Sequence, residues 1–165
     1  QPAPDFTVVD SQGKQHQLKD FAGKTVVLEW TNDQCPFVVK HYSGNMQALQ
    51  GEFTAKADQV WLSVISSAPG KQGHVSGARA DELTQSRNAK PTAVVFDETG
   101  VVGKAYEAKT TPHMYVIDKN DKIIFHPDHE RIGEIIKNNT GLDYIKKQNS
   151  GKSIYSFCNR KRWKC

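Results

Sequence analysis

The stretch 30–38 places a cysteine at a predicted boundary between a strand and a helix. Cys35 follows the β-branched run 25–30, and Pro36 comes next, a residue favoured at the first helical position because its missing N–H needs no partner there. Unpaired N–H groups and the helix dipole stabilise a thiolate at such a position. The thiolate is the nucleophilic form, so the spacing predicts an ionised, solvent-accessible Cys35 that attacks sulfur or oxygen. The alternative is a buried, inert cysteine that fills a gap in the core.

A second motif lies about 75 residues further along the chain, where Thr111 and Pro112 precede the apolar run 113–117. A proline is tolerated in a strand at its first residue or at a sheet edge. Bonds that precede proline are also the ones that adopt the cis form at modest cost. Alone this motif is weak, but together with the strand–Cys–Pro–helix unit it becomes specific.

The two motifs together resemble the thioredoxin-like superfamily, and within it the alkyl hydroperoxide reductase/thiol-specific antioxidant (AhpC/TSA) redoxins. The resemblance implies a thioredoxin-like fold with Cys35 as the redox-active residue and Thr111–Pro112 as a cis-proline step packed against it. Trp30, Pro36 and Phe37 would then form the rest of the site wall. The resemblance runs from residue 3 to residue 125, through the segments 3–6, 28–30, 35–38, 40–42, 61–73 and 96–100.

Two departures from the family pattern bear on the reaction. Dithiol oxidoreductases of this superfamily carry a second cysteine three residues after the first, and Val38 occupies that position here. Typical peroxiredoxins have Thr or Ser and then Pro at the places of Asn32 and Glu29. The resemblance therefore implies a thiol–disulfide or antioxidant oxidoreductase with one redox-active cysteine. The alternatives are a thiol peroxidase and a non-catalytic redoxin module that binds a metal or a protein.

The remaining cysteines and one acid are candidates for supporting roles. An oxidised Cys35 would be resolved by Cys158, by Cys165, by an external thiol such as glutathione, or by a cysteine of a partner protein. The alternatives for the tail are a local disulfide between Cys158 and Cys165 or two free thiols. Glu29 stands six residues before Cys35, where thioredoxins keep a buried acid that shuttles protons. A glutamate facing a sheet edge is the alternative for Glu29.

Histidines offer little support for a metal site. His113 adjoins the proline step and could join Cys35 as a soft ligand, while His126 and His129 flank a carboxylate. Since no cluster of three or four ligands is evident, we expect neither a metal nor another cofactor. The expected partners are protein or small-molecule thiols and disulfides, and peroxides under the peroxidase alternative. The sequence does not indicate an oligomeric state.

The elements that must position Cys35 alternate between strands and helices. A strand–turn–strand hairpin is predicted over 6–18, buried strands over 25–30, 60–65 and 91–96, and a late hairpin over 113–125. Helices are predicted over 36–53, 78–88, 101–108 and 132–138, the first softly interrupted at 43–45. This order predicts an α/β fold whose mixed central sheet is flanked by helices and carries an N-terminal β-hairpin.

Composition sets the outer limits. The 165 residues are 37% apolar and carry a net charge of +4, which suits one globular domain and excludes a wholly disordered chain. The excess of basic residues falls in 146–165, so we expect a redoxin domain over 1–145 and a basic tail over 146–165. Apart from this basic tail, no feature of the sequence indicates nucleic-acid binding. No apolar run approaches the roughly 20 residues that a membrane span requires. The chain begins without methionine, which fits either a cleaved export signal or a trimmed expression tag, and an exported or periplasmic location is favoured over a cytoplasmic one.

Overall fold

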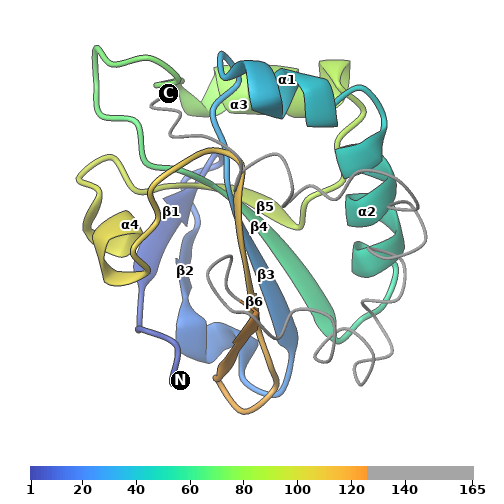
Figure 1. The fold of residues 1–165 in the computed structure, drawn as a ribbon, viewed down its shortest axis with the longest axis vertical. Coiled ribbons are helices and arrows are strands. Elements are labelled where there is room, and N and C mark those ends of the chain that lie inside the picture. The colour runs from blue at the N-terminus through green and yellow to red at the C-terminus, as the bar shows by residue number, and fades with distance from the viewer. Residues whose placement is uncertain (126–165) are drawn as a thin grey trace.

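A single mixed sheet organises residues 1–125, which are the residues that this computed structural model describes (Figure 1). Its strand order is β2-β1-β5-β4-β3-β6-β7, and β3, β4 and β5 run parallel while the other pairs are antiparallel. The predicted α/β class and mixed sheet are confirmed. The strands are β1 (Thr7–Asp10), β2 (Gln15–Gln17), β3 (Thr25–Trp30), β4 (Gln59–Ile65), β5 (Ala93–Phe96), β6 (His113–Ile117) and β7 (Ile123–Phe125).

Several predictions fall outside the described residues. These are the helix predicted over 132–138, the domain boundary at 145, the basic tail, both tail cysteines, and the histidines at 126 and 129. The predicted boundary between a redoxin domain and a tail therefore stays a prediction.

The helices lie close to the predicted positions, with one correction. They are the 3-10 helix η1 (Leu18–Phe21), α1 (Pro36–His41), α2 (Asn45–Thr54), α3 (Gly77–Ser86) and α4 (Val101–Ala105). The helix predicted over 36–53 is instead two separate helices, α1 and α2, and the chain breaks between them close to the interruption predicted at 43–45. Gly44 adopts a φ of +130° at the break, a backbone region that favours glycine, and α2 then starts in a new direction.

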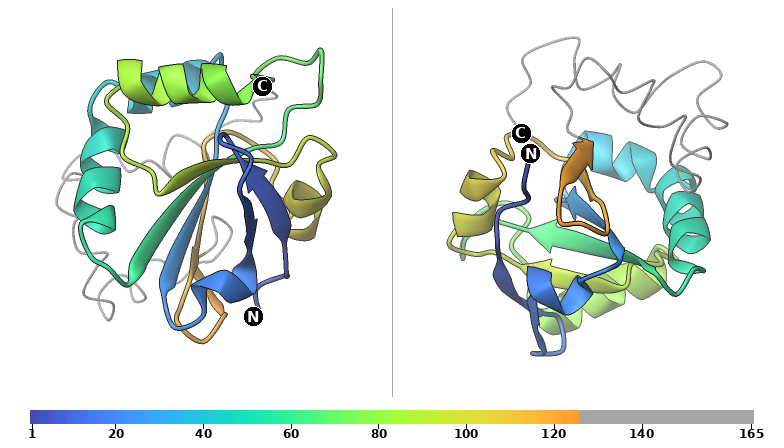
Figure 2. Two further views of the ribbon diagram at one scale, coloured as in Figure 1. Left: turned by 180° about the vertical axis from the view of Figure 1, so that it is seen from behind. Right: turned by 90° about the horizontal axis from the view of Figure 1, so that it is seen from below.

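Side-chain alternation along the strands divides the core between the two faces of the sheet. In Figure 1, α2 and α4 lie on opposite sides of the strands, and Figure 2 shows the same separation from behind and from below. One face packs against η1 and α4 and includes Leu28, Trp30 and Tyr115. The other packs against α1 and α2 and includes Val27, Cys35 and Met114. Successive side chains along β3 and β6 thus pack into different halves of the core.

The carboxyl ends of the parallel strands meet at one edge of the sheet. The loops that follow β3, β4 and β5 begin there, at Thr31, Ser66 and Asp97. Strand β6 runs the other way, so its first residue, His113, pairs with Trp30 at the end of β3. This register places the proline step beside the cysteine turn, although about 75 residues separate them in sequence.

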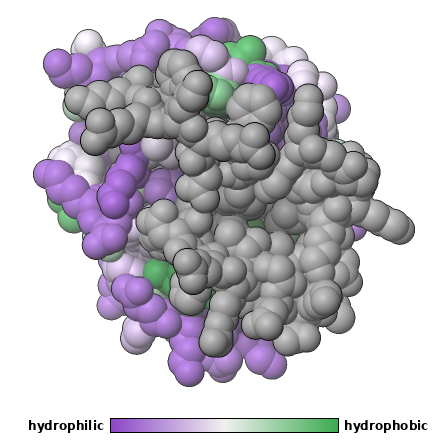
Figure 3. Space-filling view, in the orientation of Figure 1, coloured by the Kyte–Doolittle hydropathy of each residue, from purple (hydrophilic) through white to green (hydrophobic). Residues whose placement is uncertain are grey.

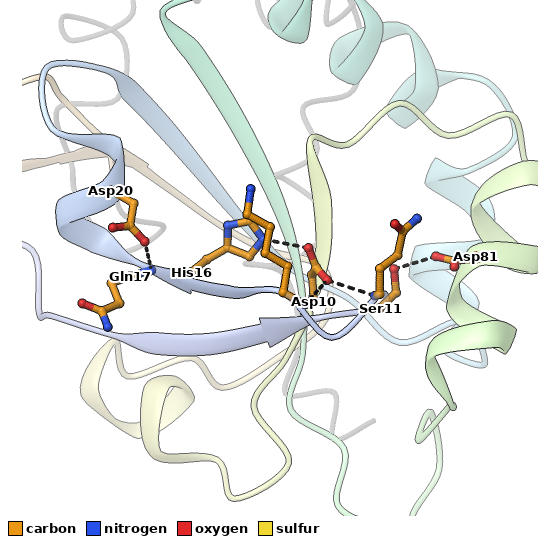
Figure 4. A network of polar contacts seen from close by, with 8 residues as sticks. Asp10, Ser11, His16, Gln17, Asp20 and Asp81 are labelled. Atoms are coloured by element: carbon orange, nitrogen blue, oxygen red, sulfur yellow. Dashed lines mark hydrogen bonds and ion pairs between the residues drawn. The ribbon is translucent and has the colours of Figure 1, made fainter.

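The N-terminal hairpin is held to α3 by polar contacts (Figure 4). The Ser11 hydroxyl donates a hydrogen bond to the Asp81 carboxylate of α3 at 2.5 Å. Within the hairpin, Asp10 accepts backbone N–H groups of Gln12 and Lys14 and lies 2.8 Å from His16 Nε2. The hairpin and α3 therefore form one unit next to β5.

Gly77, the first residue of α3, is required by this contact. A Cβ at position 77 would overlap the Ser11 carbonyl oxygen, a backbone atom that cannot move without the hairpin. We expect Gly77→Ala to lower the free energy of unfolding by about 1–3 kcal/mol, the usual cost of overpacking. Urea denaturation measures the change.

Gly51 provides the matched control for that substitution. It lies inside α2, and a Cβ there would meet only Lys90 Cγ at 3.8 Å, an ordinary contact. Gly51→Ala should therefore stabilise the protein by about 0.4–1 kcal/mol. Equal effects of the two substitutions would contradict the close approach at Gly77.

The coloured residues visible in Figure 3 are mostly hydrophilic, and the hydrophobic spots among them are small and separate. Within the described part of the chain, the exposed large hydrophobic residues are Val9, Val39 and Val101, which belong to three different elements. Among residues 1–125, no helix has the length and apolar character needed to cross a membrane.

Candidate active site

The turn that carries Cys35 is shaped by Asn32. The backbone carbonyl of Asn32 accepts the Cys35 N–H at 3.0 Å, and its side-chain Oδ1 accepts the Gln34 N–H at 2.9 Å. Gly73, in the loop after β4, packs against this side chain so closely that a Cβ there would lie 2.5 Å from Asn32 Cγ. Sequence reasoning considered Asn32 only as a departure from the peroxiredoxin pattern. The ability of Asn to bond its own backbone two residues on was the signal it missed.

The Cys35 side chain is fully buried, with 0% of its surface exposed. The predicted solvent accessibility of Cys35 was therefore wrong. Its sulfur still lies beside the proline-led strand: Cys35 Sγ donates to the Thr111 carbonyl oxygen at 3.3 Å, and the Thr111–Pro112 peptide is cis.

The structure brings some of the predicted wall residues to Cys35 and not others. Pro36 is the first residue of α1, and Phe37 is partly buried against the cluster that contains Cys35. Thr111 contacts the sulfur through its carbonyl. Trp30, by contrast, packs into the core on the opposite face of the sheet. The family resemblance implied that Trp30 lies near Cys35. Side chains alternate between the two faces along β3, however, and the Trp30 indole points to the face opposite Cys35.

The Trp30 indole instead takes part in a polar chain under α4. Its Nε1–H donates to the Ser66 hydroxyl at 3.0 Å, and Ser66 donates to the Asp97 carboxylate at 2.7 Å. The same carboxylate accepts the N–H groups of Val102 and Gly103 in α4. This chain fixes the loops that follow β4 and β5 at the edge of the sheet where Cys35 lies.

His113 is also turned away from Cys35. Its Nδ1 accepts the Lys109 N–H at 3.1 Å, and its Nε2 lies 3.2 Å from the Tyr115 hydroxyl, which donates to the Tyr106 carbonyl. Tyr115 has one proton to give, so this pattern assigns the Nε2–H tautomer to a neutral His113. With both ring nitrogens engaged, His113 anchors the segment that leads to Pro112.

Glu29 lies on the Cys35 face of β3 and is fully buried. It is in a central strand, between β4 and β6, so the alternative of an edge-facing glutamate was wrong. Its Oε1 accepts the Tyr42 hydroxyl at 2.7 Å. Its Oε2 accepts three donors, namely Trp61 Nε1 at 2.8 Å, the Ser63 hydroxyl at 3.0 Å and Gln50 Nε2 at 3.1 Å.

The charge state of Glu29 follows from this setting. Burial raises the pKa of Glu29 above its ordinary value, and the hydrogen bonds from Tyr42, Trp61, Ser63 and Gln50 offset only part of that rise. Burial also raises the pKa of Tyr42 well above 10, and the Glu29 charge adds to it, so the phenol keeps its proton. A carboxyl poised in this way can take up and release a proton nearer neutrality than an exposed glutamate.

The described residues do not assemble a metal site. No group of three or more His, Cys, Asp or Glu side chains in 1–125 is arranged to hold a metal ion. Cys35 and His113, considered as two ligands from the sequence, belong to opposite faces of the sheet.

Comparison with known proteins agrees with this architecture. Residues 1–126 match the AhpC/TSA family. The thiol-disulfide oxidoreductase ResA of Bacillus thuringiensis subsp. konkukian is 26% identical over 145 residues, which cover 88% of this chain and 75% of that protein.

Two solved structures share the fold. A conserved protein from Geobacillus kaustophilus has a TM-score of 0.69 at 22% identity, covering 93% of this chain and 86% of its own. The exposed lipoprotein thioredoxin of Streptococcus pneumoniae has a TM-score of 0.60 at 24% identity, covering 82% of this chain and 97% of its own.

The fold and the family match together define a thioredoxin-like oxidoreductase, with the type of reaction left open. Within that class, the chain belongs to the AhpC/TSA family.

Proposed function

We propose that the protein carries out thiol–disulfide exchange through Cys35 alone. The observation that supports this most directly is the 3.3 Å contact between Cys35 Sγ and the carbonyl of Thr111, next to the cis peptide with Pro112. The relative from Bacillus thuringiensis is named for the same chemistry. Val38 stands where a second cysteine would be, so the reaction must proceed through a bond to another thiol.

The proposed exchange has two steps. In the first, the Cys35 thiolate attacks one sulfur of a substrate disulfide; that S–S bond breaks, a Cys35 mixed disulfide forms, and the other sulfur leaves as a thiolate. In the second, another thiolate attacks the mixed disulfide and restores the Cys35 thiolate. Cys158, Cys165 or an external thiol would supply that second sulfur. Substrates would be protein or small-molecule disulfides.

Glu29 is the proposed proton acceptor for the Cys35 thiol. It lies on the same face of the sheet, and Tyr42 belongs both to the Glu29 network and to the cluster around Cys35. Its raised pKa makes the Glu29 carboxylate a better proton acceptor than that of an exposed glutamate. The side chains that bury the sulfur must move before a disulfide can reach it.

An exported location is part of the proposal. One solved structure of the same fold comes from an exposed lipoprotein. Disulfide exchange suits oxidising compartments outside the cytoplasm.

The test uses a variant in which Cys158→Ser and Cys165→Ser leave Cys35 as the sole thiol. Its reaction with bis(2-hydroxyethyl) disulfide is followed by mass spectrometry as a function of pH. We expect a mixed disulfide at Cys35 and a rate whose midpoint lies below about 8.5, the value of an ordinary thiol. Cys35→Ser in the full chain is the control and should show no adduct at position 35.

Two outcomes would overturn the proposal. A midpoint at or above about 8.5, with a rate no greater than that of free cysteine, indicates a binding module. Fast oxidation of Cys35 to sulfenic acid by hydrogen peroxide, without reaction with the disulfide, indicates a thiol peroxidase.

A further inference from the structure

A small cavity lies between α3 and the sheet, next to the turn that precedes Cys35. The volume within which the centre of a water molecule can lie is about 20 Å³. One water needs roughly 10–15 Å³ of such space and two to four polar partners. The polar side chains that line the cavity include Thr31, Asp33, Tyr42 and Ser63.

Two of these side chains present polar atoms that lack a protein partner. Thr31 Oγ1 and Asp33 Oδ1 are both buried, and neither makes a hydrogen bond within the described residues. Thr31 is 6% exposed, so its hydroxyl cannot turn to solvent. Asp33 as a whole is partly exposed and also lines the cavity. Buried polar atoms of this kind are normally satisfied by an ordered water.

The other two polar side chains connect the cavity to Glu29. The Tyr42 hydroxyl lies 2.7 Å from Glu29 Oε1, and the Ser63 hydroxyl lies 3.0 Å from Glu29 Oε2. Glu29 itself has no surface of its own exposed. Any proton that it exchanges with solvent must therefore pass through its hydrogen-bonded neighbours.

We propose that Thr31 and Asp33 order a water in this cavity, and that Glu29 exchanges its proton with solvent through Tyr42, this water and Asp33. Both are positioning residues, since they act on Glu29 and not on the reacting sulfur. The inference rests on the proposed function, in which Glu29 accepts the proton of the Cys35 thiol.

The transfer balances without a further reactant. When Glu29 is ionised, the Tyr42 O–H points to Glu29 Oε1. For release, the Glu29 carboxylic acid passes its proton to the Tyr42 oxygen, and the phenol passes its own proton to the water. The water passes a proton to Asp33 Oδ1, and Asp33 then releases it to solvent. Each oxygen ends with the number of protons that the ionised state of Glu29 requires.

The charged groups around this path are few. The Arg87 guanidinium lies 4.1 Å from the centre of the Tyr42 ring, and Arg87 also lines the cavity. Asp33 approaches from the turn after β3, and Glu29 from β3 itself. Ser63 and Gln50, which also contact the carboxyl or the phenol, do not titrate. The Arg87 guanidinium is a fixed positive charge, so Glu29 and Asp33 are the two carboxyl groups on the path.

The experiment measures how fast Glu29 responds to a pH jump. Infrared absorption of the protonated carboxyl is assigned to Glu29 by its loss in Glu29→Gln. We expect Asp33→Asn to slow the response roughly 100-fold, the low end of the contribution of a positioned proton-transfer group. Glu82→Gln, which neutralises an exposed acid of α3, is the matched control and should leave the rate unchanged.

Thr31→Val supplies a second, independent measurement. If the hydroxyl has no partner, its replacement by a methyl of the same shape should raise the urea midpoint of unfolding. If it holds a water, the midpoint should fall and the infrared response should slow. An unchanged rate in Asp33→Asn, a raised midpoint in Thr31→Val, or a Glu29 band that ignores pH in every variant would each overturn the relay.

Failure of the relay and failure of the proposed function are distinguishable. The mixed-disulfide assay measures the reaction of Cys35. When the disulfide reacts slowly, its rate does not depend on how quickly Glu29 exchanges its proton with solvent. A normal assay with an unchanged rate in Asp33→Asn rejects the relay only. A failed assay with a slowed Glu29 response rejects exchange at Cys35 and leaves the proton path in place.

Discussion

Replacement of Glu29 by alanine is expected to lower the free energy of unfolding by about 3–5 kcal/mol, much of the stability of a small domain. The substitution leaves four donors, from Tyr42, Gln50, Trp61 and Ser63, without their acceptor in a buried site. Each such loss costs about 1–3 kcal/mol before relaxation. Urea denaturation monitored by circular dichroism gives the value, and a loss below about 1 kcal/mol would contradict the network.

Glu29→Gln is the matched variant, because an amide oxygen can replace Oε2 and the amide N–H can donate to the Tyr42 oxygen. Its effect depends on pH with a definite sign. Burial raises the pKa of Glu29, so folding favours its protonated form. The stability that this contributes is complete below the unfolded value of about 4.3 and is lost as pH rises through the raised pKa. Glu29→Gln should therefore gain stability relative to the parent protein as pH rises through that range, and parallel curves would contradict it.

Val38→Cys is expected to give Cys35 an internal partner and to change how its mixed disulfide is cleared. Val38 is fully buried, belongs to the same cluster as Cys35, and follows it by three residues on the first turn of α1. An intramolecular thiol can act with an effective concentration of about 10⁵ M or more when it is well oriented. We expect the mixed disulfide to collapse to an internal disulfide between Cys35 and the introduced thiol faster than millimolar external thiol can attack it. Rapid acid quenching and mass spectrometry measure the two species.

Val39→Cys controls for the addition of a thiol. Val39 is the next residue of α1 and is 57% exposed, so a cysteine there adds the same group outside the cluster. Both variants carry Cys158→Ser and Cys165→Ser. If Val39→Cys forms the internal disulfide as readily as Val38→Cys, the placement of Val38 beside Cys35 is wrong.

The fold was predictable because its strongest signals are local. The β-branched runs of β3 and β4, the Cys35–Pro36 boundary and the proline before β6 each fix a backbone conformation through a few neighbouring residues. The break at Gly44 was only half foreseen, since a glycine in a helical pattern does not reveal whether its φ will be positive.

The faces of the sheet were harder to predict than the strands. Trp30 is adjacent in sequence to the cysteine turn, but pleating sends its side chain to the far core, and only the register with β4 and β6 settles this. The sequence could not decide whether Glu29 is a buried acid or faces a sheet edge for the same reason. Whether its strand is central depends on pairings with residues more than 30 positions away. The burial of Cys35 depends on tertiary packing, which no local pattern records.

The alternation of side chains between the two faces of the sheet also gives Trp30 and Trp61 different surroundings. The Trp61 indole donates to the Glu29 carboxylate at 2.8 Å, whereas the Trp30 indole donates to Ser66 from the other side of the sheet. Indole emission responds to the charge beside the ring. We therefore expect the fluorescence of Trp61 to respond to the charge of the buried acid, whereas Trp30 lies on the other face of the sheet.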